Sequence, residues 1–159
     1  MDTSVQALKT YKMHIGGEWV DAASGEIFET YDPYTAQPWA LIPRGGPSDV
    51  DRAVAAAHQA FTKGDWAEIN ATQRGALLRK LGDLLSEHAD HLAEIEVRDN
   101  GKLIAEMSAQ CKYLPQWYYY YGGLADKIEG SVIPIDKPGH FNYTLWEPLG
   151  VVAAITPWN

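Results

Sequence analysis

The sequence predicts an α/β fold in which small β elements come first, helices follow and strands return at the end. Three observations predict this order. Short alternating segments with glycine-rich turns occupy residues 11–46, apolar residues at helical spacing run through 48–128, and a continuous apolar run fills 151–155. Helices followed by a buried strand are typical of the entry to an α/β sheet, although the helices alone would also suit a bundle.

The first segment is expected to form short strands and tight turns. Gly16-Gly17 and Ala23-Ser24-Gly25 are turn signals between alternating pieces. Residues 37–46 form a further extended piece, which Pro43 and two glycines close.

Two helix starts carry the pattern of a capping box, in which two side chains satisfy backbone amides reciprocally. Ser48 with Asp51 is expected to begin one helix, and Asn70 with Gln73 a second. The second helix has an apolar face made of leucines. Its members are Leu77, Leu78, Leu81, Leu84 and Leu85.

The later helices are delimited by a glycine and a proline. Leu92 and Ile95 continue the helical spacing, in the same helix or in a separate one, and Asn100-Gly101 is a left-handed stop. A third helical stretch covers about 104–128, where Pro115 is expected to kink the helix or to start a new one.

The C-terminal part is expected to be two strands of different burial. Residues 141–146 alternate apolar and polar side chains, as a half-exposed strand does, whereas 151–155 is apolar throughout, as a strand buried on both faces is. Pro148-Leu149-Gly150 is the turn between them.

Composition limits the classes of partner. The 159 residues carry a net charge of −8 with scattered basic residues, so no nucleic-acid or membrane partner is expected. The start has no apolar signal segment, and the uncharged runs are too short to span a bilayer. Cys111 is the only cysteine, so no internal disulfide can form. These features favour a cytoplasmic protein.

Several chemical motifs are missing, and two isolated candidates have simpler explanations. The sequence has no glycine-rich nucleotide turn, no serine nucleophile elbow and no zinc pattern. His88 and His91 share a helix face and could hold a metal, but a solvated polar face is the favoured interpretation. Cys111 lies within a helix, away from any histidine, and is expected to be a packed thiol rather than a nucleophile.

Aromatic residues are the strongest sign of a binding surface. Tyr113, Trp117 and Tyr121 are spaced four apart on one helical stripe, which by default indicates core packing. Four consecutive tyrosines, residues 118–121, cannot all point inward, so some must line a groove, an interface or a channel.

The tip "ITPWN" places Asn159 just beyond the last expected strand. In open α/β sheets, ligands bind beyond the carboxyl ends of the strands. The Asn159 amide could therefore donate to a developing oxyanion, although an asparagine at such a place is more often a turn or helix-cap residue.

The chain as a whole resembles the N-terminal third of the aldehyde dehydrogenase superfamily. The matching segments occur in the family's order: "IGGEWVDAASGEIFETYDPYTA", "DVDRAVAAAHQAF", "RGALLRKLGDLL", "DNGK", "YYGGLADKIEG" and "FNYTLWEPLGVVAAITPWN". The resemblance implies an NAD(P)-dependent enzyme, using NAD or NADP, that oxidises a small-molecule aldehyde to a carboxylic acid through a cysteine thiohemiacetal. It also implies a homo-oligomer, a dimer or tetramer, when full length.

The resemblance also implies roles for individual residues. Asn159 corresponds to the catalytic oxyanion donor, Tyr113 and Trp117 to a wall of the aldehyde passage, and Thr30 with Asp99 to a monovalent-cation site found in some members. The residues expected to touch the dinucleotide are Ile155, Thr156, Pro157 and Trp158.

The implied organisation has three parts. Residues 1–135 are expected to form the N-terminal part of the NAD(P)-binding domain, 136–149 an oligomerisation β extension, and 150–159 the first buried strand of the cofactor-binding sheet. Because the family's nucleophilic cysteine and base glutamate are absent, the chain is expected to be an enzyme fragment without activity of its own. One alternative is a natural truncated product that acts as a binding or oligomerisation module, and another is a small helical protein that binds an apolar ligand in an aromatic groove.

Overall fold

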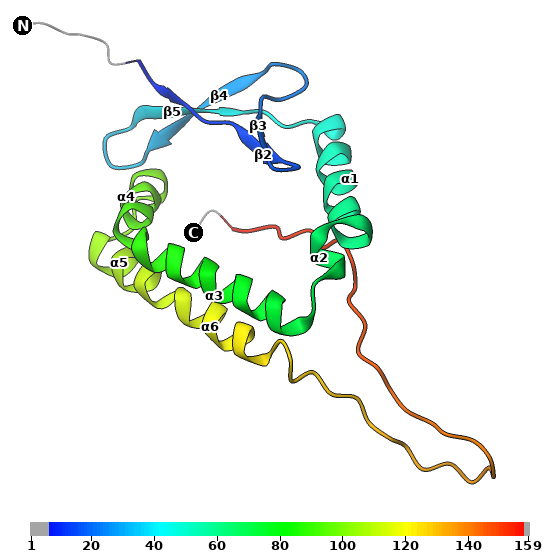
Figure 1. The fold of residues 1–159 in the computed structure, drawn as a ribbon. Coiled ribbons are helices and arrows are strands. Elements are labelled where there is room, and N and C mark those ends of the chain that lie inside the picture. Colours follow the sequence, from blue (N-terminus) through cyan, green and yellow to red (C-terminus); the bar gives the residue numbers. More distant parts are fainter. Residues whose placement is uncertain (1–6, 158–159) are drawn as a thin grey trace, which may run out of the picture.

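The computed structural model describes residues 7–157, and its strands and helices follow the predicted order as far as residue 124 (Figure 1). The strands are β1 (Lys9–Thr10), β2 (Met13–Ile15), β3 (Glu18–Val20), β4 (Ile27–Asp32) and β5 (Gln37–Pro43). The helices are α1 (Pro47–Lys63), α2 (Asp65–Glu68), α3 (Ala71–Glu87), α4 (Ala89–Asn100), α5 (Ile104–Tyr113) and α6 (Pro115–Leu124).

The strands form two small sheets. One has the order β1-β5-β4, with β1 parallel and β4 antiparallel to β5, and the other is the β2-β3 hairpin. Gly16 and Gly17 connect the hairpin with φ values of 63° and 86°. Two positive φ values in a two-residue loop define a type I′ turn, whose twist matches that of the paired strands.

The helix boundaries confirm most of the local signals. Asn70 and Gln73 cap α3 reciprocally: each backbone N–H donates to the other's side-chain oxygen at 2.9 Å. Gly101 ends α4 with a φ of 76°, and Pro115 begins α6 as a separate helix.

The expected start of α1 was wrong. The helix begins at Pro47, and the carboxylate that caps it belongs to Asp49, which accepts from the Gly46 amide at 2.9 Å, rather than to Asp51. Proline has a fixed φ and no N–H, which suits the first position of a helix, so Pro47 moves the start before Ser48.

Glycines rather than leucines make the closest contact between α3 and α6, which run side by side (Figure 1). A Cβ added to Gly75 would lie within 2.4 Å of the Gly122 oxygen, so only glycine permits this approach. The leucine face is instead partly open: Leu77, Leu81 and Leu84 are 41–48 % exposed.

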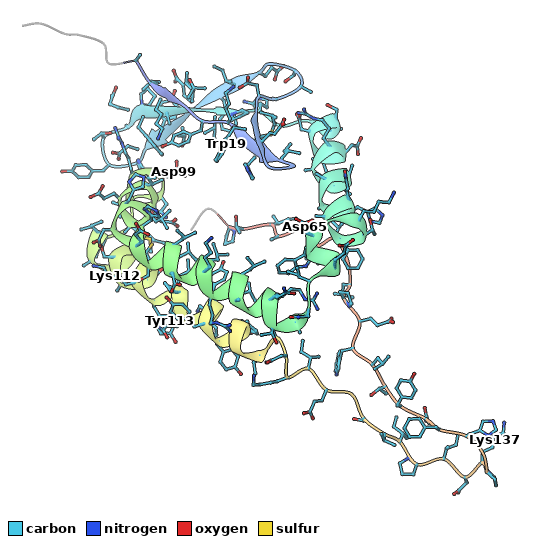
Figure 2. The ribbon with its side chains drawn as sticks, in the orientation of Figure 1. Trp19, Asp65, Asp99, Lys112, Tyr113 and Lys137 are labelled. Atoms are coloured by element: carbon cyan, nitrogen blue, oxygen red, sulfur yellow. The ribbon has the colours of Figure 1, made fainter. Side chains whose placement is uncertain are left out.

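An extended arm, residues 129–149, leaves the end of α6, turns near Lys137 and returns (Figures 1 and 2). Its two limbs pair through Ile133 N–H to Asn142 O at 3.0 Å and Thr144 N–H to Ser131 O at 2.9 Å. Only one β-bridge, Val132 with Tyr143, is formed among the arm residues. The expected β extension is therefore a loosely paired arm.

The strand expected at 151–155 is not formed in the part of the chain that the structure describes. Residues 151–157 are extended but unpaired, and Val152 and Ile155 are 70 % and 94 % exposed. A strand exists only through hydrogen bonds to a neighbour, and no described segment pairs with these residues. The rest of the expected segment, residues 158–159, lies outside the described residues.

Candidate functional site

The helix α6 carries the candidate site because two of its faces have different environments. The stripe that faces α3 contains Pro115 and Gly122, both buried. Trp117 and Tyr120, on the other side of the helix, are 51 % and 60 % exposed. The tight glycine contact with α3 thus decides which aromatic residues are free to meet a ligand.

An aromatic groove of about 400 Å³ runs along the open face of α6. Its lining is Tyr113, Gln116, Trp117, Tyr119 and Tyr120. The rings of Tyr113 and Trp117 meet edge to face, with their centres 6.1 Å apart and their planes at 86°. Tyr113 projects from the side of the helix pair that faces away from the strands (Figure 2). The two residues expected to contact an aldehyde therefore lie in one groove.

Tyr121, the third residue of the expected stripe, belongs to a different groove. That second groove has a volume of about 940 Å³ and lies between the ends of the helices and the base of the arm. Trp66, Arg74 and Trp146 also line it. Spacing by four residues places side chains on one face only approximately, and here the stripe divides between two surfaces.

Sequence reasoning expected some of residues 118–121 to line a groove but did not single out Tyr119, which lines the aromatic groove. Its hydroxyl donates to Asp83 Oδ1 at 2.9 Å, and this hydrogen bond raises the pKa of the tyrosine. The pairing itself joins residues 36 apart and depends on how α3 meets α6.

Thr30 and Asp99 come together although 69 residues separate them in the sequence. The Thr30 hydroxyl donates to Asp99 Oδ1 at 2.6 Å, which joins β4 to the C-terminal end of α4 beside the strands (Figure 2). Two oxygens at one place suit a monovalent cation, and this role stays a prediction. Within residues 7–157, no group of three or more His, Cys, Asp or Glu side chains is arranged to hold a metal ion.

Cys111 lies on α5, partly buried. Burial raises the pKa of its thiol, and the charge of Glu96 acts in the same direction. A raised pKa lowers the thiolate fraction, and only the thiolate is a strong nucleophile. The environment therefore agrees with a packed thiol.

The residues expected to touch a dinucleotide are only partly described. Ile155, Thr156 and Pro157 lie in the exposed extended segment. Trp158 and the expected oxyanion donor, Asn159, lie outside the described residues. Among residues 7–157, no helix is both long and apolar enough to cross a membrane.

Comparison with known proteins gives one consistent result. Residues 19–159 match the model of a family described as the aldehyde dehydrogenase family. The chain is 46 % identical over 152 residues to an Acinetobacter baylyi protein named (Z)-2-((N-methylformamido)methylene)-5-hydroxybutyrolactone dehydrogenase, which covers 96 % of the chain and 31 % of that relative. It is 42 % identical over 151 residues to a mitochondrial benzaldehyde dehydrogenase of Antirrhinum majus, covering 93 % of the chain and 28 % of the relative.

Solved structures agree with the sequence comparisons. An aldehyde dehydrogenase from Bacillus cereus, solved as a complex with NAD+, matches with a TM-score of 0.80 and 40 % identity, over 85 % of this chain and 28 % of that one. These matches confirm the predicted α/β fold class, with helices and small sheets arranged as in part of that larger fold. The chain spans about 30 % of the length of the curated relatives that it matches.

Proposed function

Because this chain belongs to the aldehyde dehydrogenase family, we propose that it forms part of an NAD(P)-dependent enzyme that oxidises an aldehyde to a carboxylic acid. The observation that carries the proposal is the family match over residues 19–159. The aromatic groove supports it, since Tyr113 and Trp117 together offer an apolar surface to an aldehyde. These 159 residues match about 30 % of the length of the relatives, so most of the sequence of such an enzyme has no counterpart in them.

In the proposed reaction, a cysteine thiolate adds to the aldehyde carbonyl and the carbonyl oxygen becomes an oxyanion. Cys111 is not that nucleophile, because it lies partly buried on α5 with a raised pKa. Asn159 donates its side-chain N–H to the oxyanion of the thiohemiacetal. The groove orients the aldehyde so that the carbonyl faces the nucleophile.

A bound dinucleotide would supply the hydride acceptor, so that the thiohemiacetal carbon loses its hydride to give a thioester, which water then hydrolyses to the carboxylic acid and the free thiol. Ile155, Thr156, Pro157 and Trp158 would contact it from this chain. The exposure of residues 151–157 leaves their backbone groups accessible to such a ligand. The sequence contains no glycine-rich phosphate turn, so the phosphates would be held by another part of the enzyme.

The test of this proposal uses a protein that joins this chain to a catalytic portion of the family. Asn159→Ala is expected to lower kcat by about 10²–10³, because an amide donor stabilises the charged adduct more than the neutral aldehyde. Single-turnover formation of reduced nicotinamide measures this step. The 159-residue chain by itself, and its Cys111→Ala variant, are expected to form none.

The competing role of Asn159 is that of a helix or turn cap. In that case Asn159→Ala would lower stability by about 1 kcal/mol and leave hydride transfer per folded molecule unchanged. Thermal unfolding measured beside the kinetics separates the two roles. A lowered melting temperature with an unchanged transfer rate would contradict the role as oxyanion donor.

A second candidate function is supported by the arm. Phe141, Leu145 and Trp146 are 73 %, 69 % and 78 % exposed, so the arm presents apolar side chains that its own chain does not cover. The arm also has unpaired backbone edges, which can accept a strand from another chain. We propose that it joins copies of the enzyme into a homo-oligomer.

A further inference from the structure

Tyr119 is fixed by α3 at both ends of its side chain. A Cβ added to Gly82 would lie 2.7 Å from Tyr119 Cε1 and 3.1 Å from Cδ1, so the ring lies directly on the glycine backbone. The hydroxyl donates to Asp83 Oδ1 at 2.9 Å. Adjacent residues of one helix therefore hold both the ring and its polar end.

Tyr119 therefore lies at the boundary between the face of α6 that packs against α3 and the face that carries the aromatic groove. Pro115, Tyr119 and Gly122 follow one another at helical spacing along the side that meets α3. Tyr119 nevertheless lines the aromatic groove together with Trp117 and Tyr120. Those two side chains are more than half exposed and lack such an anchor in the described contacts, whereas Tyr119 has its place set by the neighbouring helix.

The anchoring also decides what Tyr119 presents to a ligand. Because the Tyr119 hydroxyl donates its hydrogen to Asp83, it has no donor hydrogen left for a ligand in the groove that this residue lines. Gln116 contributes the only amide side chain of the lining, and the other members are aromatic. Aromatic rings prefer edge-to-face or offset arrangements with one another, and the Tyr113–Trp117 pair already adopts the first.

We propose that Tyr119, held by Gly82 and Asp83, is a positioning residue that makes the groove selective for flat aromatic aldehydes over saturated ones. The proposal rests on the function proposed above, in which the groove receives the aldehyde. Tyr119 takes no part in bond making. It acts by holding its own ring in a fixed orientation in the groove wall, so that the ring of an aromatic substrate can pack against it without a change of conformation.

The test measures binding of benzaldehyde and of cyclohexanecarbaldehyde, which has a similar size without an aromatic ring, to the 159-residue chain by ligand-observed NMR. Tyr119→Phe keeps the ring and its contact with Gly82 but removes the hydrogen bond to Asp83. It is expected to raise the Kd for benzaldehyde by about 2- to 10-fold and to change the Kd for cyclohexanecarbaldehyde by less than about 2-fold. Asp83→Leu is expected to act in the same way.

Two further variants separate positioning from general damage. Asp83→Asn keeps an acceptor oxygen for the hydroxyl and is expected to retain the preference for benzaldehyde. Tyr118→Phe removes a hydroxyl from a residue that does not line the groove and is expected to bind as the parent chain does. Circular dichroism checks that each variant is folded, and Tyr119→Phe alone decides the question if Asp83→Leu does not fold.

An unchanged ratio of the two Kd values in folded Tyr119→Phe would overturn the positioning role while leaving the groove as an aldehyde site. If the parent chain binds both aldehydes and shows no preference, the selectivity is overturned in the same way. If the parent chain binds neither aldehyde, the assignment of the groove as the aldehyde site fails as well, whereas the family membership does not depend on that result.

Discussion

Asp49 is the buried charged side chain of the described structure, with 3 % of its surface exposed. Its carboxylate accepts from the amides of Gly46 at 2.9 Å and Ala23 at 3.0 Å, and from Arg52 at 2.5 Å. It thereby joins the start of α1 to the loop that precedes β4. The hydrogen bond from Gly46, followed by that from Arg52, lowers the pKa of this carboxyl from 3.8.

The lowered pKa predicts a pH-dependent contribution of Asp49 to stability. The Asp49 carboxyl has a pKa of 3.8 in the unfolded chain and a lower pKa in the folded chain, so at acidic pH the unfolded chain binds this proton more readily. The stabilising contribution of the ionised carboxylate is therefore present above pH 3.8 and is lost as the pH falls through the folded-state pKa. Asp49→Asn should be less stable than the parent at neutral pH, and the difference should shrink below pH 3.8. Urea unfolding across this range measures it.

The matched control is Asp51→Asn, on the exposed surface of the same helix. It is expected to follow the parent chain in urea at every pH. A stability difference for Asp49→Asn that stayed constant down to the most acidic pH would contradict the role of the charge.

Ala36 adopts a left-handed backbone conformation, with a φ of 54°, in the turn between β4 and β5. This conformation costs a residue with a Cβ about 1–2 kcal/mol. Replacement by glycine removes this cost, but glycine loses more backbone entropy on folding, which cancels part of the stabilisation. Ala36→Gly is therefore expected to stabilise the fold by about 0.5–1 kcal/mol, observed as a rise of a few degrees in Tm.

The same substitution in a helix should have the opposite sign. Ala55 is exposed in α1, and Ala55→Gly is expected to destabilise by about 1 kcal/mol. If both variants lower Tm equally, the turn at Ala36 is not strained in solution.

At the scale of elements, the contact between α3 and α6 determines the candidate site. The backbones approach so closely that a Cβ on Gly122 would lie 2.9 Å from the Gly75 oxygen and 3.1 Å from Arg79 Cγ. Arg79 also donates to the Gly122 oxygen at 2.9 Å. This contact orients α6 so that its aromatic groove faces away from α3.

Two adjacent glycines of α6 test this contact. Gly122→Ala is expected to destabilise by about 1–3 kcal/mol, because the added methyl group overpacks the helix interface. Gly123→Ala, where a Cβ would meet nothing within 4 Å, is expected to stabilise by about 0.5–1 kcal/mol through its higher helix propensity. Chemical denaturation of both variants gives the comparison, and equal effects would mean that the helices do not pack as described.

At the scale of the whole molecule, the chain exposes more surface than a compact protein of its mass. Its accessible surface is 12781 Å², whereas a folded monomer of 17.6 kDa is expected to expose about 7,900 Å². The difference includes the leucine face of α3 and the apolar side chains of the arm. Exposed apolar surface of this extent is typical of contacts with other polypeptide.

The isolated chain is therefore expected to self-associate, with a mass by light scattering that rises with concentration. A Phe141→Ser, Leu145→Ser double variant of the arm should reduce the association. Leu103→Ser, at a site equally exposed but outside the arm, should reduce it much less. A parent chain that remains monomeric at all concentrations would contradict the expectation, as would equal effects of the arm and Leu103 variants.

The sequence by itself determined the family, the order of elements and several boundaries. Asn70 with Gln73, Gly101 and Pro115 act on their own few neighbours, so their effects can be deduced without knowing the fold. Tyr113 and Trp117, which the family resemblance assigned to one wall, line the same groove although they belong to the separate helices α5 and α6.

Tertiary structure alone decided which surfaces meet. It places Thr30 within hydrogen-bond distance of Asp99, and Tyr119 within hydrogen-bond distance of Asp83. Tyr121 lies in a groove separate from the aromatic groove. The close contact between α3 and α6 is made by glycines and not by leucines. The expected strand at 151–155 is unpaired for the same reason. An apolar run indicates a preference for burial, but a strand forms only when another segment supplies its hydrogen bonds, and that depends on residues distant in the chain.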